Sequence, residues 1–204
     1  MIYITGDAGI NYAGEVIDKS KKDLLGSLPI TLFCIHGNHE MRPQTVPGYK
    51  EAIWHGGTVY VEDDYPNLLF AKDGEIYELD GLNTIVIGGA YSIDKYYRIA
   101  YGYRWFADEQ PSEEIKASVE KKLDSLDWEI DVVLSHTAPL KYEPVEMFLS
   151  GIDQSRVDKS TEQWLDEIED KLTYKKWYLG HYHTEKKIDR VEIMFQTIAV
   201  FSEK

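Results

Sequence analysis

The chain of 204 residues has little cysteine, few basic residues and no long apolar run. Its one cysteine, Cys34, excludes a disulfide within the chain. Because Cys34 lies in the apolar run 30–35, we expect a buried thiol rather than a nucleophile. No stretch approaches the roughly 18 apolar residues of a membrane helix, and the N-terminus lacks a basic segment followed by a long apolar run. We therefore expect a cytoplasmic protein that does not enter a membrane.

Basic side chains are outnumbered: 22 Lys and Arg stand against 36 Asp and Glu, a formal net charge of −14. Binding to a nucleic-acid backbone depends on clustered Lys and Arg, so a nucleic-acid partner is disfavoured. A local site can still hold a phosphate, because bound metal ions are absent from the sequence count. The length suits a single domain over 1–204 with its own core, and the oligomeric state stays open.

Short runs of β-branched and aliphatic residues predict strands. Five of them are followed directly by Gly, His or Ser and are expected over 2–5, 30–35, 84–87, 131–134 and 176–179. Further strands are expected near 58–61, 68–71, 75–79 and 193–200, and the polar turns at 72–74 and 80–81 favour antiparallel pairing. Apolar spacing predicts helices over 15–25, 112–126 and 160–172, the second of them capped by Ser112. This order of elements predicts a layered α/β sandwich of mixed sheets flanked by helices.

Three polar motifs follow predicted strands, namely Gly37-Asn38-His39-Glu40, Ser135-His136-Thr137 and Gly180-His181-Tyr182-His183. Asp7 follows the first strand in the same way. Loops at the carboxyl ends of strands converge in α/β folds, so these side chains are expected to meet. Imidazole, carboxylate and amide oxygen together suit manganese, iron or zinc, whereas calcium sites use oxygen almost alone. The absence of paired cysteines argues against a structural zinc site.

These motifs resemble those of the calcineurin-like metallophosphoesterases, in particular the small intracellular members whose chain opens with a strand like 1–7 of this sequence. The family signature runs Asp-x-His, Gly-Asp, Gly-Asn-His-Asp/Glu, a lone His and Gly-His-x-His. The last three blocks stand here in that order. The resemblance implies a metal-dependent hydrolase of a phosphomonoester, phosphodiester or pyrophosphate bond, such as a phosphatase, acting on a small phosphorylated substrate.

The resemblance also implies a role for each matched residue. Asn38, His136 and His181 would bind one divalent metal ion, and His183 would bind the other. His39 would be the acid that protonates the departing oxygen. Such centres hold two ions about 3.5–4 Å apart, which activate a water for in-line attack on the phosphorus. An imidazole beside the ions can supply the proton that the leaving alkoxide needs.

The front of the chain departs from the family pattern. Gly6-Asp7-Ala8-Gly9 stands where the family has two blocks, and Gly9 stands at the position of a metal-binding His. The two blocks look fused at a shared Gly-Asp pair, with an early helix and strand removed, a βαβ passage of roughly 30 residues. If Asp7 bridges the ions, one keeps four protein ligands and the other only Asp7 and His183. We expect one tightly held ion and weakened hydrolysis. The structural alternative for Asp7 is a helix cap.

The other motif residues have structural alternatives too. His136 can be a strand-end histidine bonded to backbone, and Asn38 and His39 can close a turn. His181 and His183 alternate along the chain, so they share one side only if their loop curls. The matching alternative for the whole chain is a non-catalytic remnant that binds a metal ion or a phosphate.

Polar residues outside the motifs are interpreted as structural or surface residues rather than metal ligands. His36 and His55 match no motif position and are interpreted as ordinary polar residues. Arg98 and Arg104 lie in an aromatic stretch, where a guanidinium can either bind a substrate phosphate or serve packing and surface roles. We favour packing and surface roles for both arginines.

Overall fold

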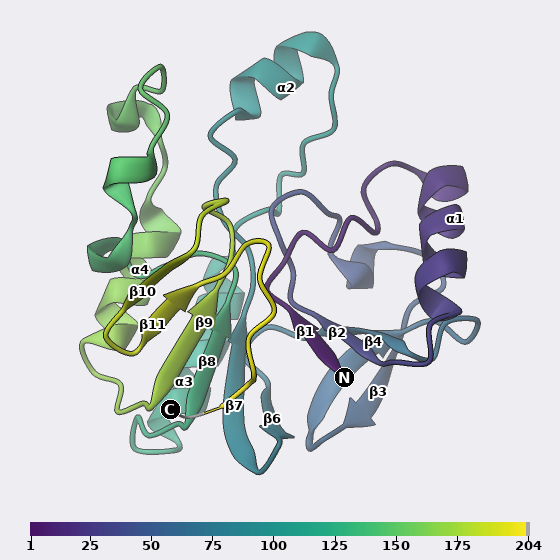
Figure 1. Ribbon diagram of the computed structural model, residues 1–204, viewed down its shortest axis with the longest axis horizontal. Helices are drawn as coiled ribbons and strands as arrows, with labels where there is room; N and C mark the ends of the chain where they lie inside the picture. Colours follow the sequence, from purple (N-terminus) through teal and green to yellow (C-terminus); the bar gives the residue numbers. More distant parts are fainter. Residues whose placement is uncertain (203–204) are drawn as a thin grey trace.

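Two mixed β-sheets lie face to face, with one helix over the outer face of the first and two helices over the outer face of the second (Figure 1). The computed structural model describes residues 1–202. The layered α/β sandwich predicted from the sequence is therefore confirmed. Within 1–202 no helix is both long and apolar enough to cross a membrane.

The first sheet has five strands and the second has six. The five-stranded sheet has the order β1 (Ile2–Ile4), β2 (Leu32–Cys34), β5 (Leu68–Ala71), β4 (Gly57–Val61) and β3 (Lys50–Trp54). The six-stranded sheet has the order β10 (Lys186–Ile188), β11 (Val191–Ile193), β9 (Lys176–Leu179), β8 (Val132–Ser135), β7 (Leu82–Ile87) and β6 (Ile76–Leu79). β1, β2 and β5 run parallel, as do β7, β8, β9 and β11.

Four α-helices accompany the sheets: α1 (Glu15–Gly26), α2 (Lys95–Tyr101), α3 (Glu113–Asp124) and α4 (Ser160–Glu169). Short 3₁₀ helices cover Pro43–Thr45, Leu140–Tyr142, Val145–Met147 and Gln154–Arg156. The predicted cap of α3 is confirmed, because the side chain of Ser112 accepts a hydrogen bond from the backbone N–H of Ile115. α1 lies beside the five-stranded sheet, whereas α2 projects from the top of the molecule in Figure 1.

Alternate residues of the central strands pack into different cores, as expected of strands covered on both faces. Phe33 of β2 packs between the two sheets with Leu134 of β8, whereas Leu32 and Cys34 face the opposite side of their sheet. Cys34 is fully buried, as predicted, and burial raises the pKa of its thiol well above the ordinary value. The other face of β8 presents Val133 to α3 and α4.

One predicted hairpin is wrong. β5 and β6 were expected to pair across the turn at 72–74, but they belong to different sheets, so the chain crosses there from one sheet to the other. Asp73 holds this crossing by accepting a hydrogen bond from the Gly88 N–H at 2.7 Å and by pairing with Arg42. The second predicted hairpin is confirmed, since β6 and β7 pair antiparallel across Asp80 and Gly81, both at positive φ.

The strand predicted over 193–200 is also wrong for most of its length. β11 ends at Ile193 because its neighbour β9 ends at the paired residue Leu179, where the chain turns into a loop. Ile198 and Val200 are 85% and 87% exposed, so their apolar character marks no strand in this fold. The sequence reasoning also missed β3, β10 and α2.

β1 is an edge strand, and within 1–202 it pairs only with β2. The expectation that an early helix and strand are missing stays a prediction. The C-terminal segment 194–201 passes beside β1 (Figure 1), and together they line a cavity of about 600 Å³. Phe201 packs on Tyr3 with ring centroids 4.7 Å apart, so this segment covers part of the apolar surface beside β1.

Candidate metal centre

The residues predicted to bind metal follow four parallel strands at the same edge of the sandwich. Asp7 follows β1 and Asn38 follows β2 in one sheet, whereas His136 follows β8 and His181 follows β9 in the other. The backbone N–H of Ile35 donates to the Ile4 carbonyl, and that of Gly180 donates to the His136 carbonyl, so each pair of loops leaves its sheet together. The two sheets therefore each contribute two side chains to one place.

Asn38 lies at the centre of this cluster. Its amide oxygen Oδ1 is 2.8 Å from Nε2 of His136 and 3.1 Å from Nδ1 of His181. The two imidazole rings meet edge to face, with centroids 5.1 Å apart. Oδ2 of Asp7 lies 3.7 Å from Nε2 of His136, and Oδ1 of Asp7 accepts a hydrogen bond from the His39 N–H at 2.9 Å.

The orientation of the Asn38 amide is fixed by a chain of buried hydrogen bonds. Its Nδ2 donates to Oγ of Ser92 at 2.8 Å, and Ser92 Oγ donates to Oε2 of Glu109 at 2.5 Å. The indole of Trp105 donates to the same Glu109 oxygen. Burial raises the pKa of Glu109 above its ordinary value, whereas the Ser92 and Trp105 hydrogen bonds oppose that rise. Because Nδ2 is engaged with Ser92, Oδ1 must face the histidines.

The ring of His136 is oriented in a similar way. Its Nδ1 lies 2.7 Å from the Thr5 carbonyl, which can only accept, so Nδ1 carries a hydrogen. In the neutral ring Nε2 then presents a lone pair to the Asn38 oxygen. Two acceptors at 2.8 Å repel each other unless a cation or a proton lies between them. A histidine that donates its other N–H to a backbone carbonyl is the usual arrangement of a metal ligand.

Charge and burial also favour a cation here. Burial opposes ionisation of Asp7, but the nearby His136 and the hydrogen bond from His39 keep the pKa of Asp7 below its ordinary value. Burial lowers the pKa of His181 well below the ordinary value, so its imidazole is neutral, the form that binds metals. Within 1–202 no group of three or more His, Cys, Asp or Glu side chains is already arranged to hold a metal ion. The contacts converge instead on the amide of Asn38, and their nitrogen and oxygen donors suit manganese, iron or zinc.

Two glycines allow this close approach. A Cβ at Gly6 would lie 2.0 Å from Nδ1 of His136, and a Cβ at Gly37 would lie 2.1 Å from Oδ1 of Asp7. Gly6 has a φ of +100°, and Asp7 itself has a φ of 54°, in a region that residues with a side chain rarely adopt. The backbone is therefore strained where it presents the Asp7 carboxylate.

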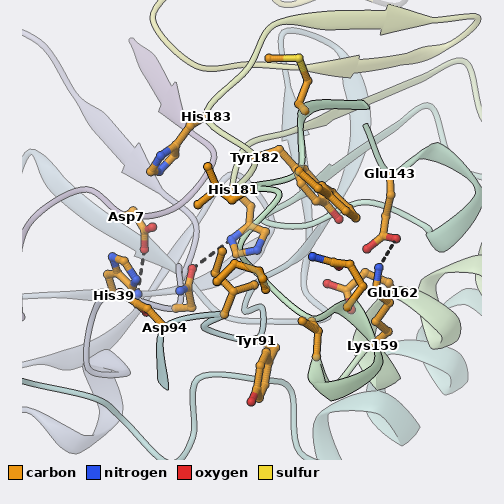
Figure 2. Close-up of a pocket in the computed structure, with 18 residues that line it drawn as sticks. Asp7, His39, Tyr91, Asp94, Glu143, Lys159, Glu162, His181, Tyr182 and His183 are labelled. Carbon is orange, nitrogen blue, oxygen red and sulfur yellow. Dashed lines mark hydrogen bonds and ion pairs between the residues drawn. The ribbon is translucent and has the colours of Figure 1, made fainter. Parts of the chain in front are cut away.

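His183 lies in the same loop as His181 but does not contact Asn38. Both histidines have positive φ, 66° for His181 and 49° for His183, so the loop curls as the alternating pattern required. The His183 ring stacks on Phe195 with centroids 5.0 Å apart. In Figure 2 His183 lies above Asp7 and His39 at one end of a cavity.

His39, the predicted acid, is half-buried at the same end of this cavity. Its ring stacks on Tyr12 with centroids 6.2 Å apart. Burial lowers the pKa of His39, and the neighbouring Asp7 opposes that effect. The His39 side chain therefore lies beside the cluster, whereas the Asn38 oxygen faces His136 and His181.

Gly9 stands at the front of the chain, where the resemblance expects a metal-binding His. Its carbonyl accepts a hydrogen bond from Nζ of Lys21 at 2.7 Å, and a Cβ at Gly9 would lie 3.5 Å from that ammonium group. A lysine therefore occupies the neighbourhood of the missing ligand. Asp7 caps no α-helix, because α1 begins at Glu15.

Sequence reasoning missed several residues that shape the centre. Ser92 and Glu109 were missed because they lie 54 and 71 positions from Asn38 and belong to no motif. Glu40 is part of a recognised motif, but its role was not foreseen: Oε1 accepts a hydrogen bond from the Gly37 N–H at 2.7 Å. Burial raises the pKa of Glu40 to about 8. Glu40 therefore braces the loop that carries Asn38.

Of the residues that match no family motif, Arg98 and His55 have other partners. Arg98 binds Asp94 and the hydroxyl of Tyr12, which is a packing role rather than a free phosphate ligand. His55 is exposed and hydrogen-bonds the Glu78 carbonyl. His36 differs from its interpretation, because it is buried and neither ring nitrogen has a hydrogen-bond partner among residues 1–202.

The cavity beside the cluster has a volume of about 450 Å³. Asp7, His39 and His183 lie at one end of it in Figure 2, and Asn38 and His181 also line it. This volume has room for a compact small molecule.

Comparison with known proteins shows the family of this chain. The family model for calcineurin-like phosphoesterases matches residues 1–185, which is most of the chain. A search of curated proteins found no significant match. The motifs, the two-sheet sandwich and the family match agree, and the chain belongs to the calcineurin-like phosphoesterase family.

Proposed function

We propose that this protein is a phosphoesterase that depends on a divalent metal ion. Asp7, Asn38, His136 and His181 would hold one ion, and His183 with Asp7 would hold a second ion more weakly. The observation that carries the proposal is the Asn38 amide oxygen, which lies 2.8 Å and 3.1 Å from two histidine nitrogens. When bound, the metal would act as a Lewis acid toward the phosphoryl oxygens and lower the pKa of a bound water.

The side chains of this protein would position the substrate and manage its protons. Asp7 and His181, as ligands of the ion, would fix where the phosphoryl end lies at the cluster. His39 lies beside that end of the cavity and would give a proton to the departing oxygen. The hydrogen bond from the His39 backbone to Asp7 ties the position of this acid to the cluster. Such proton transfer contributes typically about 10²–10⁴-fold to a rate.

The test compares two phosphomonoesters in the presence of MnCl₂: p-nitrophenyl phosphate, whose leaving group needs little protonation, and phenyl phosphate, whose leaving group needs more. We expect His39→Ala to lower kcat for phenyl phosphate far more than for p-nitrophenyl phosphate. His55→Ala, an exposed histidine elsewhere, serves as the matched control. An equal loss on both esters would show that His39 is not the acid.

A specific observation favours a second candidate, a non-catalytic domain that binds a metal ion or a phosphate. Nζ of Lys21 donates to the carbonyl of Gly9, at the position where the resemblance expects a metal-binding His, so a second ion would lack that ligand. Calorimetric titration with MnCl₂ separates the two candidates when combined with the assay. One tight ion without turnover of either ester favours the non-catalytic domain, whereas turnover favours the enzyme.

A further inference from the structure

The end of the 450 Å³ cavity away from Asp7 holds two acidic side chains and one basic one. Figure 2 shows Glu143, Lys159 and Glu162 together on the side opposite Asp7, His39 and His183. Nζ of Lys159 pairs with Oε2 of Glu143 at 2.6 Å and lies over the ring of Phe148. That ion pair engages the Lys159 ammonium group with Glu143, although its charge also acts on Glu162.

One of the two carboxyl oxygens of Glu162 accepts a hydrogen bond from another residue, although Glu162 is only 4% exposed. Its Oε1 accepts a hydrogen bond from Thr137 Oγ1 at 2.8 Å, and Thr137 Oγ1 is also 3.0 Å from the hydroxyl of Tyr182. Its Oε2 is buried and accepts no hydrogen bond from any other residue among 1–202. A buried acceptor without a donor is costly to keep, which points to a donor supplied from outside the chain.

Much of the remaining lining of this cavity is apolar. It is formed largely by the segment that follows Glu143, with side chains Met147, Phe148, Leu149, Ile152 and Val157, and by Tyr182. The rings of Phe148 and Tyr182 lie nearly parallel, at 15°, with centroids 6.3 Å apart. Such a lining suits a flat or apolar body rather than a second phosphate.

Resting on the proposed function, we propose that this cavity selects phosphoesters whose organic half is an apolar or aromatic body carrying an amine, with the phosphoryl group at Asn38 and the amine at Glu162. A cationic N–H donor would satisfy the free oxygen of Glu162 and balance its charge. Polyanionic substrates, such as inorganic pyrophosphate or a bisphosphate, would place negative charge beside Glu143 and Glu162 and are disfavoured.

The experiment uses two esters of the same shape, 4-(aminomethyl)benzyl phosphate and 4-ethylbenzyl phosphate, with the full chain and MnCl₂. We expect kcat/KM of the wild type to favour the amino ester by about tenfold or more, as a hydrogen bond to a charged group predicts. Glu162→Gln should reduce that preference to less than about threefold. Glu167→Gln, an exposed residue of the same helix, should keep the wild-type preference.

Binding of the matching benzylphosphonates, which are not hydrolysed, separates this inference from the proposed function. Selective binding of the amino phosphonate without turnover of either ester would support the inference and reject the hydrolase. Turnover of both esters with a ratio near one would reject the inference and leave the hydrolase standing. A preference that survives in Glu162→Gln also rejects it, and the wild-type ratio is informative even if that variant does not fold. Failure of both phosphonates to bind, together with no turnover of either ester, would reject both proposals.

Discussion

The amide oxygen of Asn38 and Nε2 of His136 face each other at 2.8 Å. The Asn38 amide nitrogen donates to Ser92, and Nδ1 of His136 donates to the Thr5 carbonyl. When the ring is neutral, both of the facing atoms are therefore hydrogen-bond acceptors. Two sheets hold this contact, because Asn38 follows β2 and His136 follows β8. A cation at this position relieves the repulsion between the two lone pairs. The contact is therefore the most direct structural argument for a metal ion in this protein.

Ser92→Ala tests the orientation of Asn38. Without the Ser92 hydroxyl, Nδ2 of Asn38 loses its acceptor and the amide is free to turn its oxygen away from the histidines. We expect the affinity for Mn²⁺ to fall by about 10- to 100-fold, as is typical for residues that orient metal ligands. Isothermal titration calorimetry measures this change, with the exposed Ser20→Ala on α1 as the control. Unchanged affinity in Ser92→Ala would show that Ser92 does not set the orientation of the amide.

His181→Ala and His183→Ala should separate the two metal positions. His181 contacts the Asn38 oxygen, whereas His183 stacks on Phe195 and lines the cavity without that contact. We expect His181→Ala to remove the tight Mn²⁺ site and His183→Ala to change its affinity by less than about threefold while lowering turnover. Two tight sites of similar affinity in the wild type would contradict this assignment.

Gly6→Ala tests the close approach of His136 to the backbone. The added Cβ would lie 2.0 Å from Nδ1 of His136, so the ring or the strand end must move. Gly102→Ala is the matched control, since Gly102 also has positive φ but nothing lies within 4 Å of its added Cβ. We expect Gly102→Ala to cost about 1–2 kcal/mol and Gly6→Ala about 1–3 kcal/mol more. Urea unfolding measures both, and equal costs would argue against the clash.

Glu162 should make stability depend on pH. Burial raises its pKa from 4.5 to about 7, and Glu143 adds to this rise, whereas the hydrogen bond from Thr137 and the charge of Lys159 oppose it. Between these two pH values the unfolded chain has lost the proton and the folded chain keeps it, so the free energy of unfolding falls as pH rises. The contribution is about 3 kcal/mol across the window.

Glu162→Gln removes this titration, so the variant should gain stability relative to the wild type as pH rises from 4.5 to about 7. Urea unfolding at pH 5 and pH 8 measures the difference. Glu167→Gln, which is exposed, should show a constant difference from the wild type. A constant difference for Glu162→Gln as well would mean that its carboxyl titrates normally in the folded protein.

The fold was predictable where local pattern and burial agree. Phe33 and Leu134 sit in near-continuous apolar runs, and strands covered on both faces require such runs. The motif histidines were predictable as neighbours because parallel strands end at one edge, and the structure brings His136 and His181 together at Asn38. Their roles as metal ligands remain predictions.

Other features depend on contacts that no local pattern records. The turn at 72–74 has hairpin composition, yet Asp73 bonds Gly88 and Arg42 and sends the chain to the other sheet. The run 193–200 has strand composition, yet β9 offers no partner beyond Leu179. The support that Ser92 gives to Asn38 joins positions 54 residues apart, so only the folded chain reveals it.

The candidate centre has a mechanical consequence as well as a chemical one. Asp7 and Asn38 come from the five-stranded sheet, and His136 and His181 come from the six-stranded sheet. An ion bound by all four side chains would cross-link the two sheets at one edge of the sandwich. Separating the sheets would then require loss of the ion, so the same four side chains would contribute both to catalysis and to the stability of the folded protein.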